Sequence, residues 1–297
     1  MTTTNDPDPR YGAGYGAGSG ADSGTGAAPG PTPDLSRELE AALAAAAAGA
    51  AELDARYRPG GVRDTASSKG QRRNLVTDAD RAAEAAVLRV LAERFPDDAV
   101  MAEESAPEML RVARYWCVDP LDGTNNFAHG IPLFCVSVAL VIDGVPRVGV
   151  IHAPLLREVY STCGDGAVLN GEPIAVSATS EVADGIFATG FAYDRENLPD
   201  DNTANFRSVL MACRGMRRCG SAALDLAWVA CGRLDGFWEL WLNPWDLAAG
   251  AALVRAAGGS VSDMSGGDAW LSGAHIAATN GCVHDALLSL LGGPSRA

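Results

Sequence analysis

The sequence predicts an α+β protein, because two helical segments precede a run of antiparallel strands, and alternating strands and helices follow it. Residues 35–57 are rich in alanine with charges at both ends, which favours a helix. Residues 134–169 contain short β-branched apolar runs separated by tight turns, which favours an antiparallel meander. From residue 186 onward, strands and helices alternate in a second αβ portion. We find no internal repeat.

The segments before the meander are bounded by helix-breaking residues. The first helix ends at residues 58–61, which read Arg-Pro-Gly-Gly, and residues 61–73 are predicted to form a loop or a flexible hairpin. A second helix over 77–95 carries Ala83, Val87 and Leu91 at helical spacing and ends at Pro96. Residues 99–102 then predict a short strand.

Two tight turns divide the meander into its strands. Asp143-Gly144 separates the runs 134–142 and 145–152, and Asp-Gly between β runs is a strong hairpin signal. Asn170-Gly171 forms the second turn. Further strands are predicted at 158–163, 167–169, 186–190, 235–240, 260–262 and 276–279, and further helices at 202–213, 221–230, 243–257 and 284–291.

Residues 1–33 differ in composition from the rest of the chain. They consist mainly of Gly, Ala, Ser, Thr, Asp and Pro, without an aliphatic cluster that could form a core. This composition predicts a disordered tail.

The charge and apolar content narrow the classes of partner. Among the 297 residues, 47% are hydrophobic, which is enough for a sizeable core. The formal net charge of −14 argues against nucleic acid or an anionic membrane as a partner, since both require a basic surface. An acidic protein that handles phosphate would need metal ions to neutralise the local charge.

The cysteines and the N-terminus indicate a cytoplasmic protein. The 7 cysteines include no Cys-x-x-Cys pair, and most lie in apolar surroundings, so we expect reduced core residues. Only 4 histidines are present, and none is spaced with cysteines as in a zinc finger. We expect neither a secretory signal nor a membrane span.

The segment 116–127 holds the main candidate site. Asp119, Asp122 and Thr124 follow the apolar run 115–118, and Pro120 predicts that the chain turns there. Thr124 is a candidate helix N-cap. Carboxylate, hydroxyl and carbonyl oxygens suit Mg²⁺, and a helix start suits phosphate. The alternative is an acidic, solvated turn, for which Asp-Pro and Asp-Gly are typical.

Three other polar segments have both a functional and a structural interpretation. Glu103-Glu104 follows the short strand 99–102, and two neighbouring strands that both end in acids would form a metal site; a solvated turn is the alternative. Asp246 begins a helix, where an acid can serve as a cap. Residues 220–222, Gly-Ser-Ala, could present amides to an anion or could pack closely against a neighbour.

Together these motifs resemble the inositol monophosphatase family. The pattern consists of Glu103-Glu104, then residues 119–124 (Asp-Pro-Leu-Asp-Gly-Thr), then residues 245–250 (Trp-Asp-Leu-Ala-Ala-Gly). The resemblance covers residues 35–291. It implies a layered αβαβα sandwich and a catalytic domain over 34–297, built from two αβ halves of about 34–180 and 181–297. It also implies a Mg²⁺-dependent, lithium-sensitive phosphatase.

The family's pattern implies a role for each site residue. The first metal would be surrounded by Glu103, Asp119, the Leu121 carbonyl and Thr124, and the second by Asp119, Asp122 and Asp246; Glu103 would also hold a third, weaker ion. Glu104 would support this cluster, and Lys69 and Asp80 would match the mobile loop and the Thr–Asp pair, although Asn74 stands where many relatives have Asp. Substrate would contact Asp122, Asp246, Glu239, the amides of Gly123 and Thr124, and the backbone at Ser221 and Ala222.

The chemistry implied by the resemblance is attack on a phosphate monoester by a metal-activated water, with Asp119, Glu103 and Thr124 as catalytic residues. Asn125-Asn126-Phe127 after Thr124 resembles the branch that hydrolyses inositol 1-phosphate. Histidinol phosphate and other sugar phosphates stay open as substrates, as does a binding or regulatory relative without turnover. The resemblance leaves a homodimer open.

Overall fold

The structure is a computed structural model that describes residues 34–62, 67–68, 75–76, 78–272 and 275–291. The predicted tail at 1–33 and the predicted site residue Lys69 lie outside the described residues. From Leu35 onward the chain forms one compact unit.

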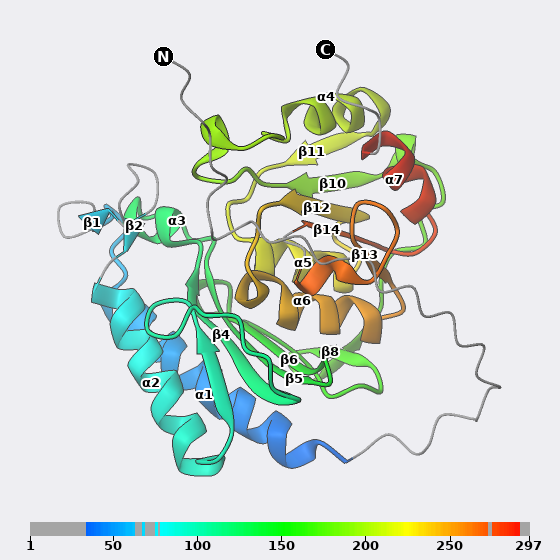
Figure 1. Cartoon of the computed structure of the whole chain (residues 1–297). Coiled ribbons are helices and arrows are strands. Elements are labelled where there is room, and N and C mark those ends of the chain that lie inside the picture. Colours follow the sequence, from blue (N-terminus) through cyan, green and yellow to red (C-terminus); the bar gives the residue numbers. More distant parts are fainter. Residues whose placement is uncertain (1–33, 63–66, 69–74, 77, 273–274, 292–297) are drawn as a thin grey trace, which may run out of the picture. The chain divides into compact units, whose positions relative to one another are not determined.

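Two sheets and three helical layers make up this unit (Figure 1). The seven-stranded sheet has the order β3-β4-β5-β6-β7-β8-β9, and the five-stranded sheet has the order β11-β10-β12-β14-β13. A separate pair, β1 (Ser67–Ser68) and β2 (Leu75–Val76), is antiparallel. The strands of the first sheet are β3 (Ala99–Ala102), β4 (Arg114–Asp122), β5 (Cys135–Ile142), β6 (Val145–Ala153), β7 (Glu158–Thr162), β8 (Ala167–Leu169) and β9 (Glu172–Ile174). Those of the second are β10 (Ile186–Thr189), β11 (Gly215–Arg217), β12 (Gly236–Leu240), β13 (Ser260–Ser262) and β14 (His275–Thr279).

Three pairs of helices cover the faces of the two sheets: one pair lies on each outer face, and one pair lies between the sheets. The helices are α1 (Ser36–Arg56), α2 (Asp78–Arg94), α3 (Thr124–Ala128), α4 (Thr203–Ala212), α5 (Ala222–Ala230), α6 (Pro244–Ala256) and α7 (His284–Leu291). The first pair, α1 and α2, covers the outer face of the seven-stranded sheet, and α5 with α6 fills the space between the sheets. The outer face of the five-stranded sheet packs against α4 and α7.

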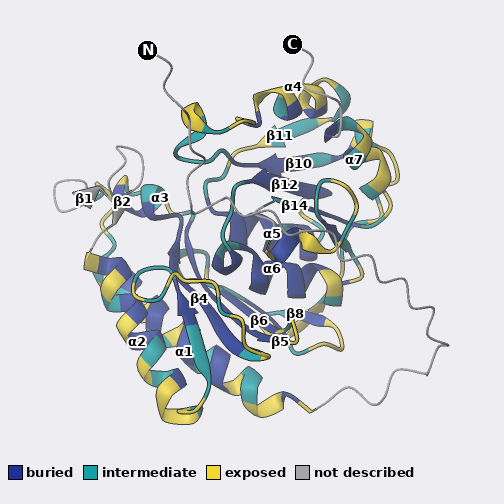
Figure 2. Cartoon of the chain, viewed as in Figure 1, coloured by how far each residue is buried: buried dark blue, intermediate teal, exposed yellow. Residues whose placement is uncertain are grey.

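Each sheet has helices on both faces because successive side chains of a strand point to opposite faces, and apolar side chains point both ways. In β5, Val136 and Val138 join the core beneath α1 and α2, whereas Cys135 and Ala139 join the core of α5 and α6. Both faces are therefore buried, and Figure 2 shows the central strands and helices as mostly buried ribbon. Such burial explains why these strands read as continuous apolar runs.

The second sheet follows the same rule. Phe187 and Trp238 pack towards α4 and α7, and Ala188 and Phe237 pack towards α5 and α6. Glu239 follows Trp238 and lies on the same face as Phe237, which is the inner face. The predicted α+β class and αβαβα layering are confirmed.

Most predicted elements are present, and the predicted turn at Asp143-Gly144 is confirmed. Asp143 and Gly144 have φ values of 52° and 74°, as the tightest hairpin turns require. The sequence did not predict β11, which is a short edge strand. No helix among the described residues combines the length and the apolar character needed to cross a bilayer.

Two expectations for the central segment were wrong. β4 does not stop before Pro120 but continues to Asp122, with a shift of register between Asp119 and Asp122. A bulge tolerates proline because the ladder is already interrupted there. Thr124 is not the N-cap of α3; that position is Gly123, and the Thr124 side chain makes other contacts.

Candidate active site

The first two acids of the site leave neighbouring strands at the same level. β3 and β4 are parallel, with Ala102 opposite Val118. The next residues are Glu103 and Asp119, and the Glu103 N–H donates to the Val118 carbonyl at 3.2 Å. The sequence-based expectation that two acid-terminated strands share one sheet edge is thus realised in the geometry.

The bulge in β4 brings a third acid to the same place. Asp119 Oδ1 accepts a hydrogen bond from the Leu121 N–H at 2.9 Å, which closes the bulge. Asp122 then lies opposite Cys135 of β5. Asp119 is 1% exposed and Asp122 is 8% exposed, so the two carboxylates are nearly removed from solvent.

Asp246 completes the cluster from the second half of the chain. One carboxylate oxygen from each of Asp119, Asp122 and Asp246 lies within 4.8 Å of the others. Asp246 Oδ2 accepts from the Asn243 N–H at 2.7 Å in a capping box at the start of α6. Asp246 therefore has both roles: it caps the start of α6, and it belongs to the acid cluster.

The start of α5 holds Asp122. Asp122 Oδ2 accepts from the Ser221 hydroxyl at 2.6 Å and from the Ala223 N–H at 2.7 Å. The Gly-Ser-Ala step thus presents donors to an anion, and this anion is a side chain of the protein itself. In all three aspartates, one oxygen is fixed by a donor, so the other can bind a cation.

Burial and mutual repulsion dominate the electrostatics of the cluster. Burial raises the pKa of Asp119 well above its usual value, and the charges of Glu103, Asp122 and Asp246 raise it further. Burial also raises the pKa of Asp246, followed by the charges of Asp122 and Glu103. A set of buried acids that includes only oxygen donors fits hard divalent cations such as Mg²⁺, which would relieve this repulsion.

Thr124 connects the cluster to α2. The Thr124 hydroxyl lies 3.0 Å from Asp80 Oδ1 and 3.0 Å from the Leu121 carbonyl, and it can donate its single hydrogen to either. Asp80 is fully buried. Gly123 precedes Thr124 with a φ of 98°, and a Cβ there would lie 2.8 Å from the Leu133 carbonyl, so this tight approach requires glycine.

Glu84 is a buried acid that the sequence analysis did not identify. It lies four residues after Asp80 on α2 and is 4% exposed, and its Oε2 accepts from the Glu104 N–H at 2.9 Å. Glu84 thereby fixes the turn that carries Glu103 and Glu104. The available signal was the i,i+4 spacing of two acids on one helix face.

Glu239 and Asp225 are further buried acids near the cluster. Burial raises the pKa of Glu239 well above its usual value, while the nearby Arg218 lowers it. Asp225, on α5, is 2% exposed, and its Oδ1 has no hydrogen-bond partner among the described residues. Burial raises the pKa of Asp225 to about 8, while the Cys219 thiol and Arg218 counter this rise and the Asp122 charge adds to it.

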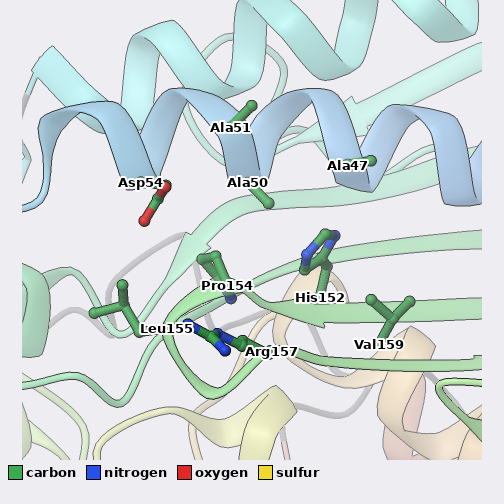
Figure 3. A pocket seen from close by; sticks show the side chains of 9 residues that line it. All are labelled: Ala47, Ala50, Ala51, Asp54, His152, Pro154, Leu155, Arg157 and Val159. Carbon is green, nitrogen blue, oxygen red and sulfur yellow. The ribbon is translucent and has the colours of Figure 1, made fainter.

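His152 lies away from this site. Ile151 and Ala153 face the inner core, so the intervening His152 side chain points to the opposite face of the sheet, towards α1. There it lines a cavity of about 580 Å³ together with residues of α1 and of the β6–β7 connection (Figure 3). All seven cysteines are free, as predicted, but only Cys117 and Cys135 are buried, so the expectation that the cysteines are core residues was wrong for the other five. Cys135 Sγ lies 3.9 Å from Asp122 Oδ2.

A sandwich of this layering with an acidic cluster between its halves matches one known family. The model of the "Inositol monophosphatase family" matches residues 34–292. The chain therefore belongs to the inositol monophosphatase family, as its motifs predicted, and is a phosphatase by that membership.

Individual relatives agree with this assignment. The chain is 47% identical over 226 residues to an inositol-1-monophosphatase of Synechocystis, covering 75% of this chain and 78% of the relative. It is 42% identical over 226 residues to a protein of Pseudomonas aeruginosa named Nus factor SuhB, covering 74% and 83%. The solved structure of inositol monophosphatase from Anabaena is similar with a TM-score of 0.79 at 42% identity, covering 87% of this chain and 96% of that one.

We predict that Glu84→Ala weakens Mn²⁺ binding about tenfold, because a buried N–H left without its acceptor costs about 1–3 kcal/mol and frees the Glu103–Glu104 turn. Glu84→Gln keeps an acceptor oxygen and should retain most of the affinity. Calorimetric titration of each variant with Mn²⁺ measures the effect.

Asp98→Ala is the matched control. Asp98 accepts hydrogen bonds from Arg114 and Trp116 at the far end of the same strand pair, at 2.9–3.0 Å. Its loss should lower the melting temperature and leave Mn²⁺ affinity unchanged. A Glu84→Ala variant that loses only thermal stability, as Asp98→Ala does, would contradict the positioning role.

We predict that Asp225→Asn stabilises the protein most at alkaline pH. The folded state holds the Asp225 proton up to about pH 8, whereas the unfolded chain releases it near pH 4. The wild-type protein therefore loses folding stability as the pH rises between these two values, by about 1.4 kcal/mol for each pH unit. Asparagine stays neutral throughout. Melting temperatures between pH 5 and 8.5 should diverge with rising pH, and parallel curves for the two proteins would refute the prediction.

Proposed function

We propose that the protein hydrolyses phosphate monoesters of polyols with two or three Mg²⁺ ions, and that inositol 1-phosphate is its substrate. The observation that carries this proposal is the convergence of Asp119, Asp122 and Asp246 within 4.8 Å, beside Glu103. Clusters of buried acids destabilise a fold unless cations neutralise them, so a cluster retained at this density points to metal binding.

The ligands divide between two principal ions. Glu103, Asp119, the Leu121 carbonyl and Thr124 would surround the first, and Asp119, Asp122 and Asp246 the second; Glu103 would also reach a third. Asp119 is shared and is the most central of these residues. When bound, Mg²⁺ would neutralise the ester's charge and increase the acidity of a bound water.

Thr124 and Asp80 would handle the proton of the attacking water. With its own hydrogen donated to Asp80, the Thr124 hydroxyl has lone pairs left to accept a hydrogen from water. Glu103, at the end of β3, is the neighbouring base, and Glu104 supports its turn. The backbone N–H groups at the start of α3, from Gly123 and Thr124, would orient the phosphate.

The alcohol part of the substrate would lie towards the five-stranded sheet. Glu239 extends from the inner face of β12, and Ser221 with Ala222 begins α5 beside Asp122. A buried carboxylate that accepts hydrogen bonds from hydroxyl groups discriminates against alcohols that lack them. The relative from Synechocystis is named for inositol 1-phosphate chemistry, which supports this choice over histidinol phosphate.

A regulatory role is the second candidate function. The Pseudomonas relative of similar identity is named a Nus factor. Such a role would not need the complete acid cluster, and the chain retains every carboxylate of the family pattern, so we rank hydrolysis first.

We predict that Asp119→Asn lowers Mg²⁺-dependent hydrolysis of inositol 1-phosphate by at least about a thousandfold, because loss of the shared ligand displaces both ions. The fold should survive and the melting temperature should rise, since one of several repelling acids is removed. Phosphate release by wild type and variant, with Mg²⁺, with chelator and with lithium, measures this. Lithium and chelator should each suppress wild-type turnover.

Hydrolysis rates on a panel of phosphate esters of inositol, histidinol, fructose and adenosine would identify the preferred substrate. Preference for histidinol phosphate over inositol 1-phosphate would overturn the substrate assignment. Full activity of Asp119→Asn, or turnover that survives chelation, would overturn the metal-dependent mechanism.

A further inference from the structure

The parallel strands of the second sheet end beside the acid cluster. β10 pairs in parallel with both β11 and β12, so the carboxyl ends of the three strands share one edge. Ligands of open sheets bind at such an edge. The residues found there are Gly190 after β10, Arg218 after β11 and Glu239, the second-last residue of β12.

Glu239 and Gly190 are in direct contact at this edge. A Cβ on Gly190 would lie 2.1–2.2 Å from the carboxylate atoms of Glu239, a distance that excludes any side chain there. Because position 190 is glycine, the Glu239 carboxylate can occupy the space that a side chain there would fill. It also brings the following segment, residues 190–202, next to that carboxylate.

Hydrogen bonds fix the far end of the 190–202 segment. Asn202 donates from Nδ2 to the Gly190 carbonyl at 2.8 Å and to Thr189 Oγ1 at 2.9 Å, which ties both ends together. The Trp241 indole N–H donates to the Asp200 carbonyl at 2.8 Å. Both Asn202 and Trp241 have left-handed backbone, with φ of 67° and 66°.

This backbone is costly for a residue as large as tryptophan, and such strain gathers where a ligand is held. Here the left-handed residue Trp241 holds the 190–202 segment through the hydrogen bond from its indole to the Asp200 carbonyl. The segment is therefore anchored to the second sheet at both of its ends.

Tyr193 is the residue that this segment carries to the site. Its hydroxyl forms a hydrogen bond with the side chain of Asn125, which belongs to α3 in the other half of the chain. Burial raises the pKa of Tyr193, and the charges of Asp122 and Glu239 raise it further while Arg218 lowers it. The phenol is therefore hydrogen-bonded to Asn125 and close enough to Asp122 and Glu239 for their charges to act on it.

We propose that Tyr193 is a specificity-determining residue that, together with Glu239, recognises adjacent hydroxyl groups on the alcohol part of a polyol monophosphate. This inference rests on the proposed function and specifies how the substrate class is selected. A phenol can donate and accept, and a carboxylate accepts, so the pair matches two neighbouring hydroxyl groups. Alcohols without hydroxyl groups would leave both partners desolvated and unpaired.

The test compares two esters that differ only in hydroxyl groups. Inositol 1-phosphate and cyclohexyl phosphate share a six-membered ring and an alkoxide leaving group. We measure the ratio of their kcat/KM values for wild type, Tyr193→Phe, Glu239→Ala and Tyr160→Phe. Tyr160 is the matched control, because its hydroxyl is also hydrogen-bonded, to Glu158 at 2.6 Å, but it lies on β7.

We expect Tyr193→Phe to lower the ratio about fivefold, the scale of one neutral hydrogen bond, and Tyr160→Phe to leave it unchanged. A fall with Glu239→Ala but not with Tyr193→Phe would refute the role of Tyr193 and leave the polyol assignment intact. An unchanged ratio in both variants would refute the polyol assignment as well, and equal falls for Tyr193→Phe and Tyr160→Phe would show a structural effect only.

Discussion

Repulsion among buried carboxylates is the constraint on which the rest of the structure depends. Asp119, Asp122 and Asp246 bring oxygens within 4.8 Å of one another in a region where burial already disfavours charge. Each is held by a donor: the Leu121 amide, the start of α5, and the Asn243 amide. The fold thus stabilises one oxygen of every acid and leaves the remaining charge for cations to neutralise.

Both halves of the chain are needed to build this arrangement. The first half supplies parallel β3 and β4 and the bulge that turns Asp122 into place. The second half supplies the starts of α5 and α6, which bind Asp122 and position Asp246. Because the proposed metal ligands come from both, cation binding would stabilise the contact between the halves as well as the site, a coupling expected whenever a ligand binds only the folded state.

The sequence was most informative where a pattern was repeated along an element. β-branched apolar runs separated by tight turns predicted the strands, and helical spacing with Pro and Gly at the ends predicted the helices. Three acidic motifs in order predicted the cluster, although the sequence alone did not reveal its geometry. The bulge in β4 was missed because proline usually ends a strand, and only the pairing with β5 shows that this one does not.

Single polar residues were harder to predict than motifs. Glu84 reads as an ordinary charged residue of a helix, and the sequence does not show that its carboxylate meets the Glu104 N–H, twenty residues away in the chain. Tyr193 lies in a segment without periodicity. Hydrogen bonds from the side chains of Asn202 and Trp241 hold the two ends of this segment, and no local sequence pattern predicts them. Asp225 continues an apolar helix, and nothing local indicates that its carboxyl lacks a partner.

The most direct test of the account is anomalous diffraction from crystals of the protein grown with Mn²⁺ and phosphate. The account predicts at least two strong peaks that share Asp119 as a ligand, one on the side of Glu103 and one between Asp122 and Asp246. Crystals that contain Mn²⁺ elsewhere but show no peak within coordinating distance of Asp119 would contradict it.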